Sequence, residues 1–220
     1  MRPRLLVLAL SLVLVACSSE PSPTPSIACP TAAPTAIDAQ AALEDAAVAT
    51  VTVSGAVSGE FVMELHGDAA PIATANFVTL ARCGFYDGIK FHRVLAGFVA
   101  QAGDPGTKTN EGDFPRLGAG GAGYEYEIES PAADLGYDPY SVSVANDTRT
   151  NDSQFFIALT DLNNGLARSY TIFGQVVSGM DVIDQIAGVP VNNPRDGVPL
   201  TAVTIDHIAI SPEPTPSPSG

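Results

Sequence analysis

One stretch in the middle of the chain, residues 91–104, combines a cation, an aromatic ring and an amide. Its residues alternate up to Gly97, and a glycine there allows a tight bend between two strands. The bend would bring Arg93, Phe98 and Gln101 to one apolar groove. A guanidinium fork beside an aromatic floor suits a neutral amide substrate. Taken alone, the stretch fits an edge strand with one solvated arginine equally well.

Three segments in the second half of the chain favour the groove over the edge strand. They are Ser141 to Asn146, Asn151 to Ile157 and Ser169 to Gly174. Together with the arginine strand they resemble the cyclophilins, a family of peptidyl-prolyl cis-trans isomerases that carries four such strings in this order. The resemblance covers residues 48–210. Each string alone is weak evidence for the family. The resemblance rests on the order and spacing of all four strings.

The resemblance implies a substrate groove and assigns its residues. It implies catalytic roles for Arg93, Gln101 and Phe98. The substrate-binding residues that it implies are Val99, Ala145, Asn146, Gln154, Phe156, Leu166 and Tyr170. It implies no cofactor and no metal, and the partners that it implies are proline-containing unfolded or flexible polypeptides.

The chemistry that such a groove would perform is rotation about one bond. An X-Pro amide isomerises over a barrier of about 18 to 20 kcal/mol because rotation breaks amide resonance. At the twisted transition state the prolyl nitrogen regains its lone pair, so the resemblance gives Arg93 the role of stabilising donor. Phe98, Val99, Phe156 and Leu166 would hold the proline ring.

The hydrophobic pattern predicts a mainly β fold. Alternating residues predict eight or so antiparallel strands between residues 48 and 210. Helical spacing predicts one helix over residues 70–82 and a second from the stripe of Ile183, Ile186 and Ala187, which ends at Gly188. A capping box is expected at Ser178 to Asp181. Closure removes exposed edges, so we expect a closed eight-stranded antiparallel β-barrel capped by two α-helices, as the resemblance also implies.

Composition bounds the class of protein. The chain has 220 residues, 45% of them hydrophobic, which is enough for one domain with a substantial core. Its formal net charge of -14 makes nucleic acid an unsuitable partner and would also repel anionic lipid headgroups. We expect a soluble monomeric domain.

The N-terminus predicts export. Residues 1–4 are basic and residues 5–16 are apolar but too short to span a bilayer, which is typical of a signal peptide over residues 1–16. Leu14 to Cys17 resembles the bacterial lipobox, so Cys17 is expected to be lipidated and to hold an extracytoplasmic protein on a membrane. An ordinary signal peptide with an incidental cysteine is the alternative.

The two ends of the chain are rich in proline and small residues. Residues 17–47 form a Pro/Ser/Ala-rich segment that we interpret as a tether, with a turn of helix at residues 43–47. Residues 211–220 are interpreted as a disordered tail.

Two cysteines remain once Cys17 is set aside. In an oxidising compartment Cys29 and Cys83 are candidates for one disulfide, although spacing alone also permits two unpaired thiols.

Three functions are compatible with these patterns. The first is a membrane-tethered isomerase that assists the folding of exported proteins. The second is a catalytically weak module that binds proline-containing peptides, for which Arg93 would be unnecessary. The third is a structural envelope lipoprotein, which would leave the grouping of Arg93, Gln101 and Phe156 without a purpose.

Overall fold

The computed structural model describes residues 27–109, 118–146 and 150–212. The helices are α1 (Ala36–Leu43), α2 (Pro71–Arg82) and α3 (Met180–Ala187), with a 3₁₀ turn, η1 (Pro105–Lys108). The strands are β1 (Val48–Gly55), β2 (Gly59–Leu65), β3 (Arg93–Leu95), β4 (Val99–Ala102), β5 (Tyr126–Glu127), β6 (Ser141–Asn146), β7 (Thr150–Ala158), β8 (Ile172–Ser178) and β9 (Val203–Ser211). The predicted signal peptide, Cys17 and most of the predicted tail lie outside the described residues.

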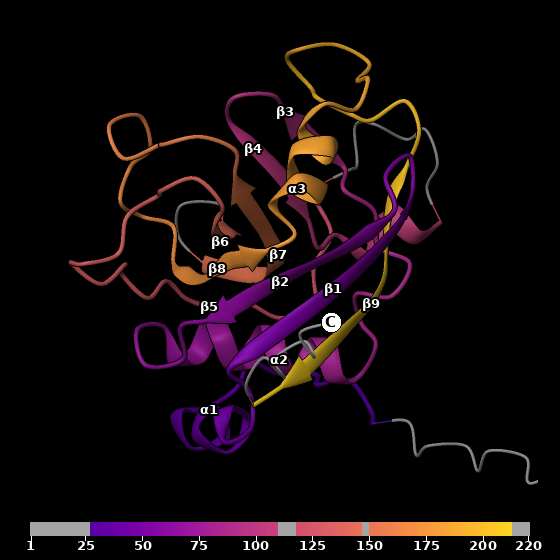
Figure 1. The fold of residues 1–220 in the computed structure, drawn as a ribbon. Coiled ribbons are helices and arrows are strands. Elements are labelled where there is room, and N and C mark those ends of the chain that lie inside the picture. The colour runs from indigo at the N-terminus through magenta and orange to yellow at the C-terminus, as the bar shows by residue number, and fades with distance from the viewer. Residues whose placement is uncertain (1–26, 110–117, 147–149, 213–220) are drawn as a thin grey trace, which may run out of the picture.

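The strands form one antiparallel sheet that curls into a half-barrel (Figure 1). Its order is β3-β4-β7-β6-β8-β2-β1-β9, and β5 pairs with β7. The sheet therefore has nine strands and an open order, where the sequence predicted eight strands and closure. Between the two ends the described residues form an isolated bridge, Lys90 with Thr204, and no ladder between named strands.

The gap between β3 and β9 has a local cause. The loop residue Gly197 occupies the outer edge of β3, where its carbonyl accepts from the Val94 amide at 2.7 Å, so β3 forms no ladder with the edge of β9. The irregular segment before β3 covers that edge instead: the Gly88 and Phe91 amides donate to β9 carbonyls, and the Ile205 amide donates to the Ile89 carbonyl. The edge of β9 is thus hydrogen-bonded without a regular strand.

Helices α2 and α3 lie at opposite ends of the curled sheet (Figure 1). Helix α2 begins at Pro71, which suits a first turn because its missing amide hydrogen would have no partner there. The Glu129 carboxylate accepts hydrogen bonds from the Ile72 and Ala73 amides at 3.0 and 2.7 Å. A distant side chain thus caps this helix, at the end where a negative charge is favourable.

Two helix starts differ from the sequence-based expectation. The box expected at Ser178 to Asp181 is wrong: α3 is preceded by Gly179 at φ 75°, and no side chain caps it. A Cβ at Gly179 would clash with the Glu60 carbonyl oxygen, so close packing against β2 requires glycine there. The third helix, α1, lies in the segment interpreted as a tether, and Thr35 and Asp38 form its capping box.

The interior is divided into two hydrophobic clusters. The larger one fills the curled sheet beneath α2, where the Phe77 ring lies 5.1 to 5.7 Å from the rings of Tyr86, Phe155 and Phe173. The smaller cluster joins the outer face of the sheet to the loops beside it, and its buried members are Val99, Tyr137, Phe156, Ala158, Leu162 and Ile172. The smaller cluster underlies the groove described below.

The N-terminal segment is fastened to α2 from residue 29 onward. Cys29 and Cys83 form a disulfide. The Arg82 guanidinium donates to the Ala42 carbonyl at 2.9 Å, and α1 packs against α2. Part of the predicted tether over residues 17–47 is therefore folded, because a capped helix and a covalent link offset its small hydrophobic content.

We expect the double variant Cys29→Ser, Cys83→Ser to unfold at a lower temperature than the wild type. The disulfide closes a loop with a sequence separation of 54. Its loss should lower the free energy of unfolding by roughly 2 to 4 kcal/mol in the chain-entropy model. Thermal melts with and without reductant measure the effect. An equal melting temperature for both proteins would contradict a stabilising role.

Candidate functional site

The β3–β4 hairpin positions the predicted cation. Gly97 adopts φ 72° between the two strands, a conformation that other residues adopt only with strain. The bend pairs Arg93 with Gln101 across the hairpin. The half-buried guanidinium donates to Gln101 Oε1 at 3.3 Å, and its central carbon lies 5.7 Å from the centre of the Phe98 ring. The structure thus brings the three predicted catalytic residues together.

A chain of amide hydrogen bonds extends behind the arginine. Gln101 Nε2 donates to Gln154 Oε1 at 3.0 Å. Gln154 Nε2 then donates to the carbonyl oxygens of Gly118 and Gly120, at 2.9 and 2.7 Å. Because each amide uses both its donor and its acceptor, the chain fixes the direction of the Gln101 carbonyl. That carbonyl in turn holds the guanidinium.

A cavity of about 250 Å³ opens in front of Arg93. Its lining consists of residues that the sequence assigned to the groove: Arg93, Phe98, Val99, Gln101, Ala145, Asn146, Phe156, Leu166 and Tyr170. Val99 and Phe156 form a buried floor, 2% and 5% exposed. The Phe156 and Tyr170 rings meet edge to face at 5.5 Å. The cavity therefore offers an apolar surface with one cation at its edge.

Gln154, which the sequence also assigned to the groove, lies one step further from Arg93. It does not line this cavity but a neighbouring one of about 290 Å³, which shares Gln101, Ala145 and Asn146 with the first. The side chain is 8% exposed and is hydrogen-bonded on both sides. Its position indicates that Gln154 orients Gln101 and the loop at Gly118.

The Tyr170 side of the cavity is held by a residue that the sequence did not single out. Tyr137 is fully buried, and its hydroxyl accepts from the Tyr170 amide at 3.1 Å. The same hydroxyl lies 3.0 Å from the Tyr170 carbonyl oxygen and 3.2 Å from that of Ala167, either of which accepts its proton. Burial raises the pKa of Tyr137, so the donor stays protonated. Nearby, Asn146 Nδ2 donates to the Ser169 carbonyl at 2.8 Å.

His92, the residue before Arg93, adds no charge to the site at neutral pH. Burial lowers the pKa of His92 to about 4, the Asp104 carboxylate opposes this effect and Arg93 adds to it. His92 is therefore neutral at pH 7. Asp104 is also buried and accepts from the Gly106, Gly118 and Gly120 amides. The Asp104 carboxylate therefore binds the same loop, at Gly118 and Gly120, that Gln154 binds through its amide.

The fold and the site together define a class of protein with a curled antiparallel sheet, a cavity with an apolar floor and a fixed guanidinium beside that cavity. The family model described as cyclophilin type peptidyl-prolyl cis-trans isomerase/CLD matches residues 48–210. The chain belongs to this family. The family predicted from the four strings is thereby confirmed, and with it the enzyme class, peptidyl-prolyl cis-trans isomerase.

Curated relatives agree with the family match. A peptidyl-prolyl cis-trans isomerase of Helicobacter pylori is 42% identical over 58% of this chain and 74% of its own length. The peptidyl-prolyl cis-trans isomerase-like 1 of Emericella nidulans is 38% identical over 67% of this chain and 86% of its own. An isomerase of Rhizopus delemar is 37% identical over 71% of this chain, which spans only 24% of that relative.

Solved structures resemble the whole domain. A cyclophilin-type isomerase of Cryptosporidium parvum superposes with a TM-score of 0.65 and 27% identity, over 77% of this chain and 99% of that one. The same isomerase in the presence of the dipeptide Ala-Pro gives a TM-score of 0.63 and 28% identity, over 74% and 98%. The mainly β fold expected from the sequence is therefore confirmed.

We expect Tyr137→Phe to weaken substrate binding more than turnover. The variant leaves the Tyr170 amide without its acceptor, which should cost about 1 to 3 kcal/mol of stability and loosen the groove wall. KM should rise several-fold with little change in kcat. Tyr140→Phe is a matched control, because the Tyr140 hydroxyl donates to Asp184 on the surface. Unchanged KM in a stable Tyr137→Phe protein would contradict the bracing role.

We expect His92 to contribute to acid sensitivity. Its pKa of about 4 lies below its value in the unfolded chain, so between about pH 6.5 and pH 4 the unfolded state binds a proton that the folded state does not. The free energy of unfolding should fall by roughly 2 to 3 kcal/mol across that window as pH decreases. Melts of wild type and His92→Gln at pH 7 and pH 4.5 should show a smaller pH effect in the variant.

The matched control for His92 is His207→Gln. His207 is exposed, and its Nδ1 lies 3.4 Å from Asp87 Oδ1. Wild type and His207→Gln therefore differ only in one imidazole at the surface. The melting temperatures of the control should follow the wild type closely at both pH values. An equal pH effect in His92→Gln and wild type would contradict the account.

Proposed function

We propose that this protein catalyses rotation about X-Pro peptide bonds in exported proteins and thereby assists their folding. The observation that carries the proposal is the guanidinium of Arg93, held by Gln101 at the edge of an apolar cavity. The presence of Ala-Pro with the Cryptosporidium relative supports a proline-containing peptide as the substrate.

The cavity supplies each requirement of the rotation. The floor of Val99 and Phe156, with Phe98 and Leu166, holds the proline ring, while the Asn146 backbone and Gln101 hold the flanking peptide. Rotation is then confined to one side of the bond. The planar amide is charge-separated and prefers water, so the dry floor weakens its resonance.

Arg93 acts on the twisted state. When the amide twists, the prolyl nitrogen regains a lone pair that a guanidinium N–H can bind. The Gln101 contact holds the donor in place before the substrate arrives, so little reorganisation is needed at the transition state. The reaction requires no bond cleavage, and the proposed mechanism uses neither a cofactor nor a metal.

A binding module without turnover is the alternative. It would use the same apolar cavity, but it would gain little from a cation whose position is fixed by a chain of amides behind it. The fixed Arg93 therefore favours the enzyme.

We also propose that the protein is an extracytoplasmic lipoprotein and a monomer. The basic start, the apolar run over residues 5–16 and the lipobox-like string ending at Cys17 support the anchor. The Cys29–Cys83 disulfide supports an oxidising compartment. In the part of the chain that the structure describes, no helix is long and apolar enough to cross a membrane.

We expect Arg93→Ala to abolish most turnover while leaving the fold and peptide affinity intact. If the guanidinium contributes about 3 to 4 kcal/mol at the transition state, kcat/KM should fall roughly 100- to 1000-fold. A protease-coupled assay on X-Pro peptides measures kcat/KM, and a thermal melt checks the fold. Near-normal turnover with an unchanged melt would refute the catalytic role.

Two controls accompany that variant. Arg195→Ala removes an exposed arginine of the loop that follows α3, and it should leave kcat/KM unchanged. Phe156→Ala removes part of the groove floor, so it should weaken peptide binding and destabilise the fold by about 3 kcal/mol. A wild type without turnover that still binds proline peptides would establish the binding module instead.

We expect Cys17 to be the acylated N-terminus of the mature protein. Stable anchoring requires more than one acyl chain, so a diacylated thioether is expected in the membrane fraction. Mass spectrometry of the N-terminal peptide identifies the modification, and Cys17→Ser should release the protein from the membrane. An unmodified N-terminus at another residue would exclude the lipoprotein.

A further inference from the structure

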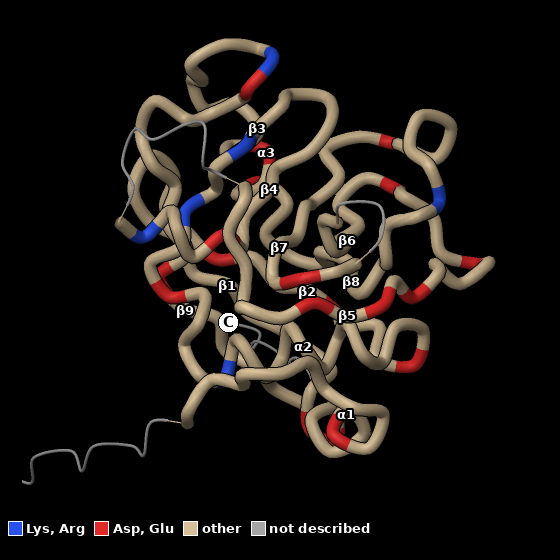
Figure 2. The backbone as a smooth tube through the Cα atoms, turned by 180° about the vertical axis from the view of Figure 1, so that it is seen from behind, with Lys and Arg blue, Asp and Glu red and all other residues tan. Residues whose placement is uncertain are grey.

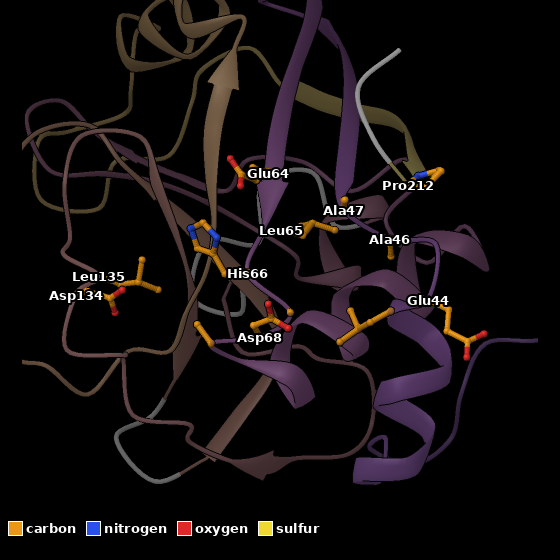
Figure 3. A pocket seen from close by; sticks show the side chains of 13 residues that line it. Glu44, Ala46, Ala47, Glu64, Leu65, His66, Asp68, Asp134, Leu135 and Pro212 are labelled. Atoms are coloured by element: carbon orange, nitrogen blue, oxygen red, sulfur yellow. The ribbon is translucent and has the colours of Figure 1, made fainter. Parts of the chain in front are cut away.

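A third hollow, of about 380 Å³, lies between the N-terminal segment and the end of β2 (Figure 3). It shares no lining residue with the cavity in front of Arg93. Its apolar surface comes from Leu43 and Ala46, from Leu65 at the end of β2 and from Leu135 in the loop before β6. Ala46 and Leu65 are buried, 7% and 8% exposed.

The mouth of this hollow is acidic. Glu64, Asp68 and Asp134 contribute carboxylates, and the His66 imidazole lies among them (Figure 3). All three carboxylates are exposed, and none has a hydrogen bond or an ion pair with another described residue. Their charges are therefore available to a partner.

Two arginines beside the hollow keep their positive charges but form no ion pair with these three carboxylates among the described residues. Arg82 donates to the carbonyls of Ala42 and Asp45, and Arg168 donates to the carbonyl of Leu135. Both guanidinium groups are thus committed to backbone oxygens. Figure 2 shows Asp and Glu gathered around α1, β2 and β5, while most Lys and Arg lie elsewhere on the backbone.

One side of the hollow is an addition to the family's domain. Leu43, Ala46 and Ala47 precede residues 48–210, which the family model matches. They are held in place by the Cys29–Cys83 disulfide and by the packing of α1 on α2. The hollow therefore depends on the N-terminal segment of this chain.

We propose that this hollow docks a lysine or arginine of a polypeptide client, flanked by an apolar residue. Lys and Arg bury an aliphatic stem along apolar surface and keep the charged head in water, which matches an apolar floor with a carboxylate mouth. Opposite charges across the contact favour basic segments over acidic ones. We take this polypeptide to be a substrate of the isomerase that places its proline in the groove at the same time. This part of the proposal rests on the proposed function.

Other occupants fit this surface less well. Among the described residues no group of three or more His, Cys, Asp or Glu side chains is arranged to hold a metal ion. Anionic lipid headgroups would be repelled by the three carboxylates. A basic, partly apolar peptide satisfies both the floor and the mouth.

The test measures binding of a proline-free peptide, fluorescein-Lys-Leu-Lys-Leu-Lys, to the full chain by fluorescence anisotropy. The double variant Asp68→Lys, Asp134→Lys should bind at least about ten-fold more weakly than wild type. It should also gain affinity for the matched peptide with glutamate at each lysine. Wild-type binding should weaken steeply between about 0.1 and 1 M salt, because these charges are exposed.

The matched control is Glu127→Lys, Asp181→Lys, which changes the net charge equally at exposed positions outside the hollow. It should keep the wild-type affinity, and both double variants should keep isomerase turnover. Equal losses in the two variants would reduce the effect to net charge, and displacement by excess Ala-Pro peptide would place the peptide in the groove. Either result, or no binding to wild type, would overturn the proposal. Failure of turnover with intact docking would reject the isomerase function and leave the docking site standing.

Discussion

The pairing of Arg93 with Gln101 across a short hairpin is the constraint on which the site depends. A long side chain on a three-residue strand would ordinarily sample many rotamers, and fixing it costs conformational entropy. Gln101 offsets that cost because its own amide is fixed by Gln154, and Gln154 is fixed by two loop carbonyls. The guanidinium is therefore oriented by the fold before any substrate binds.

The rest of the architecture supports an apolar floor beside this polar chain. The groove floor belongs to the smaller cluster, while α2 and the curled sheet enclose the larger one. Tyr137 connects the smaller cluster to the backbone on the Tyr170 side of the cavity. The polar chain and the apolar floor share two strands, because Val99 and Gln101 lie on β4 while Gln154 and Phe156 lie on β7.

The groove could be predicted largely from sequence because its residues lie in short strings on neighbouring strands. Arg93, Phe98 and Gln101 are brought together by a local bend at Gly97, and the register of β4 with β7 places Phe156 opposite Gln101. Gln154 could not be placed in the same way, because its partners are carbonyls of a distant glycine-rich loop.

The role of Tyr137, the helix α1 and the open sheet were not predicted from the sequence. Tyr137 stands in a loop, and its role appears only when the chain returns at Tyr170. The helix α1 had a readable signal in Thr35 and Asp38, but its small residues resembled a tether. The closed barrel was expected from the number of strands, but the outer edge of β3 is hydrogen-bonded to Gly197 in a loop and the sheet stays open.

The central claim is that Gln101 acts on catalysis through Arg93, and a double-mutant cycle tests it most directly. Exchange NMR measures the rate of cis-trans exchange of an Ala-Pro peptide at a concentration that saturates the enzyme. The four proteins compared are wild type, Gln101→Ala, Arg93→Ala and the double variant. The account predicts strong non-additivity: Gln101→Ala slows exchange in the wild-type background and has almost no effect once Arg93 is absent. Independent, additive losses would contradict it.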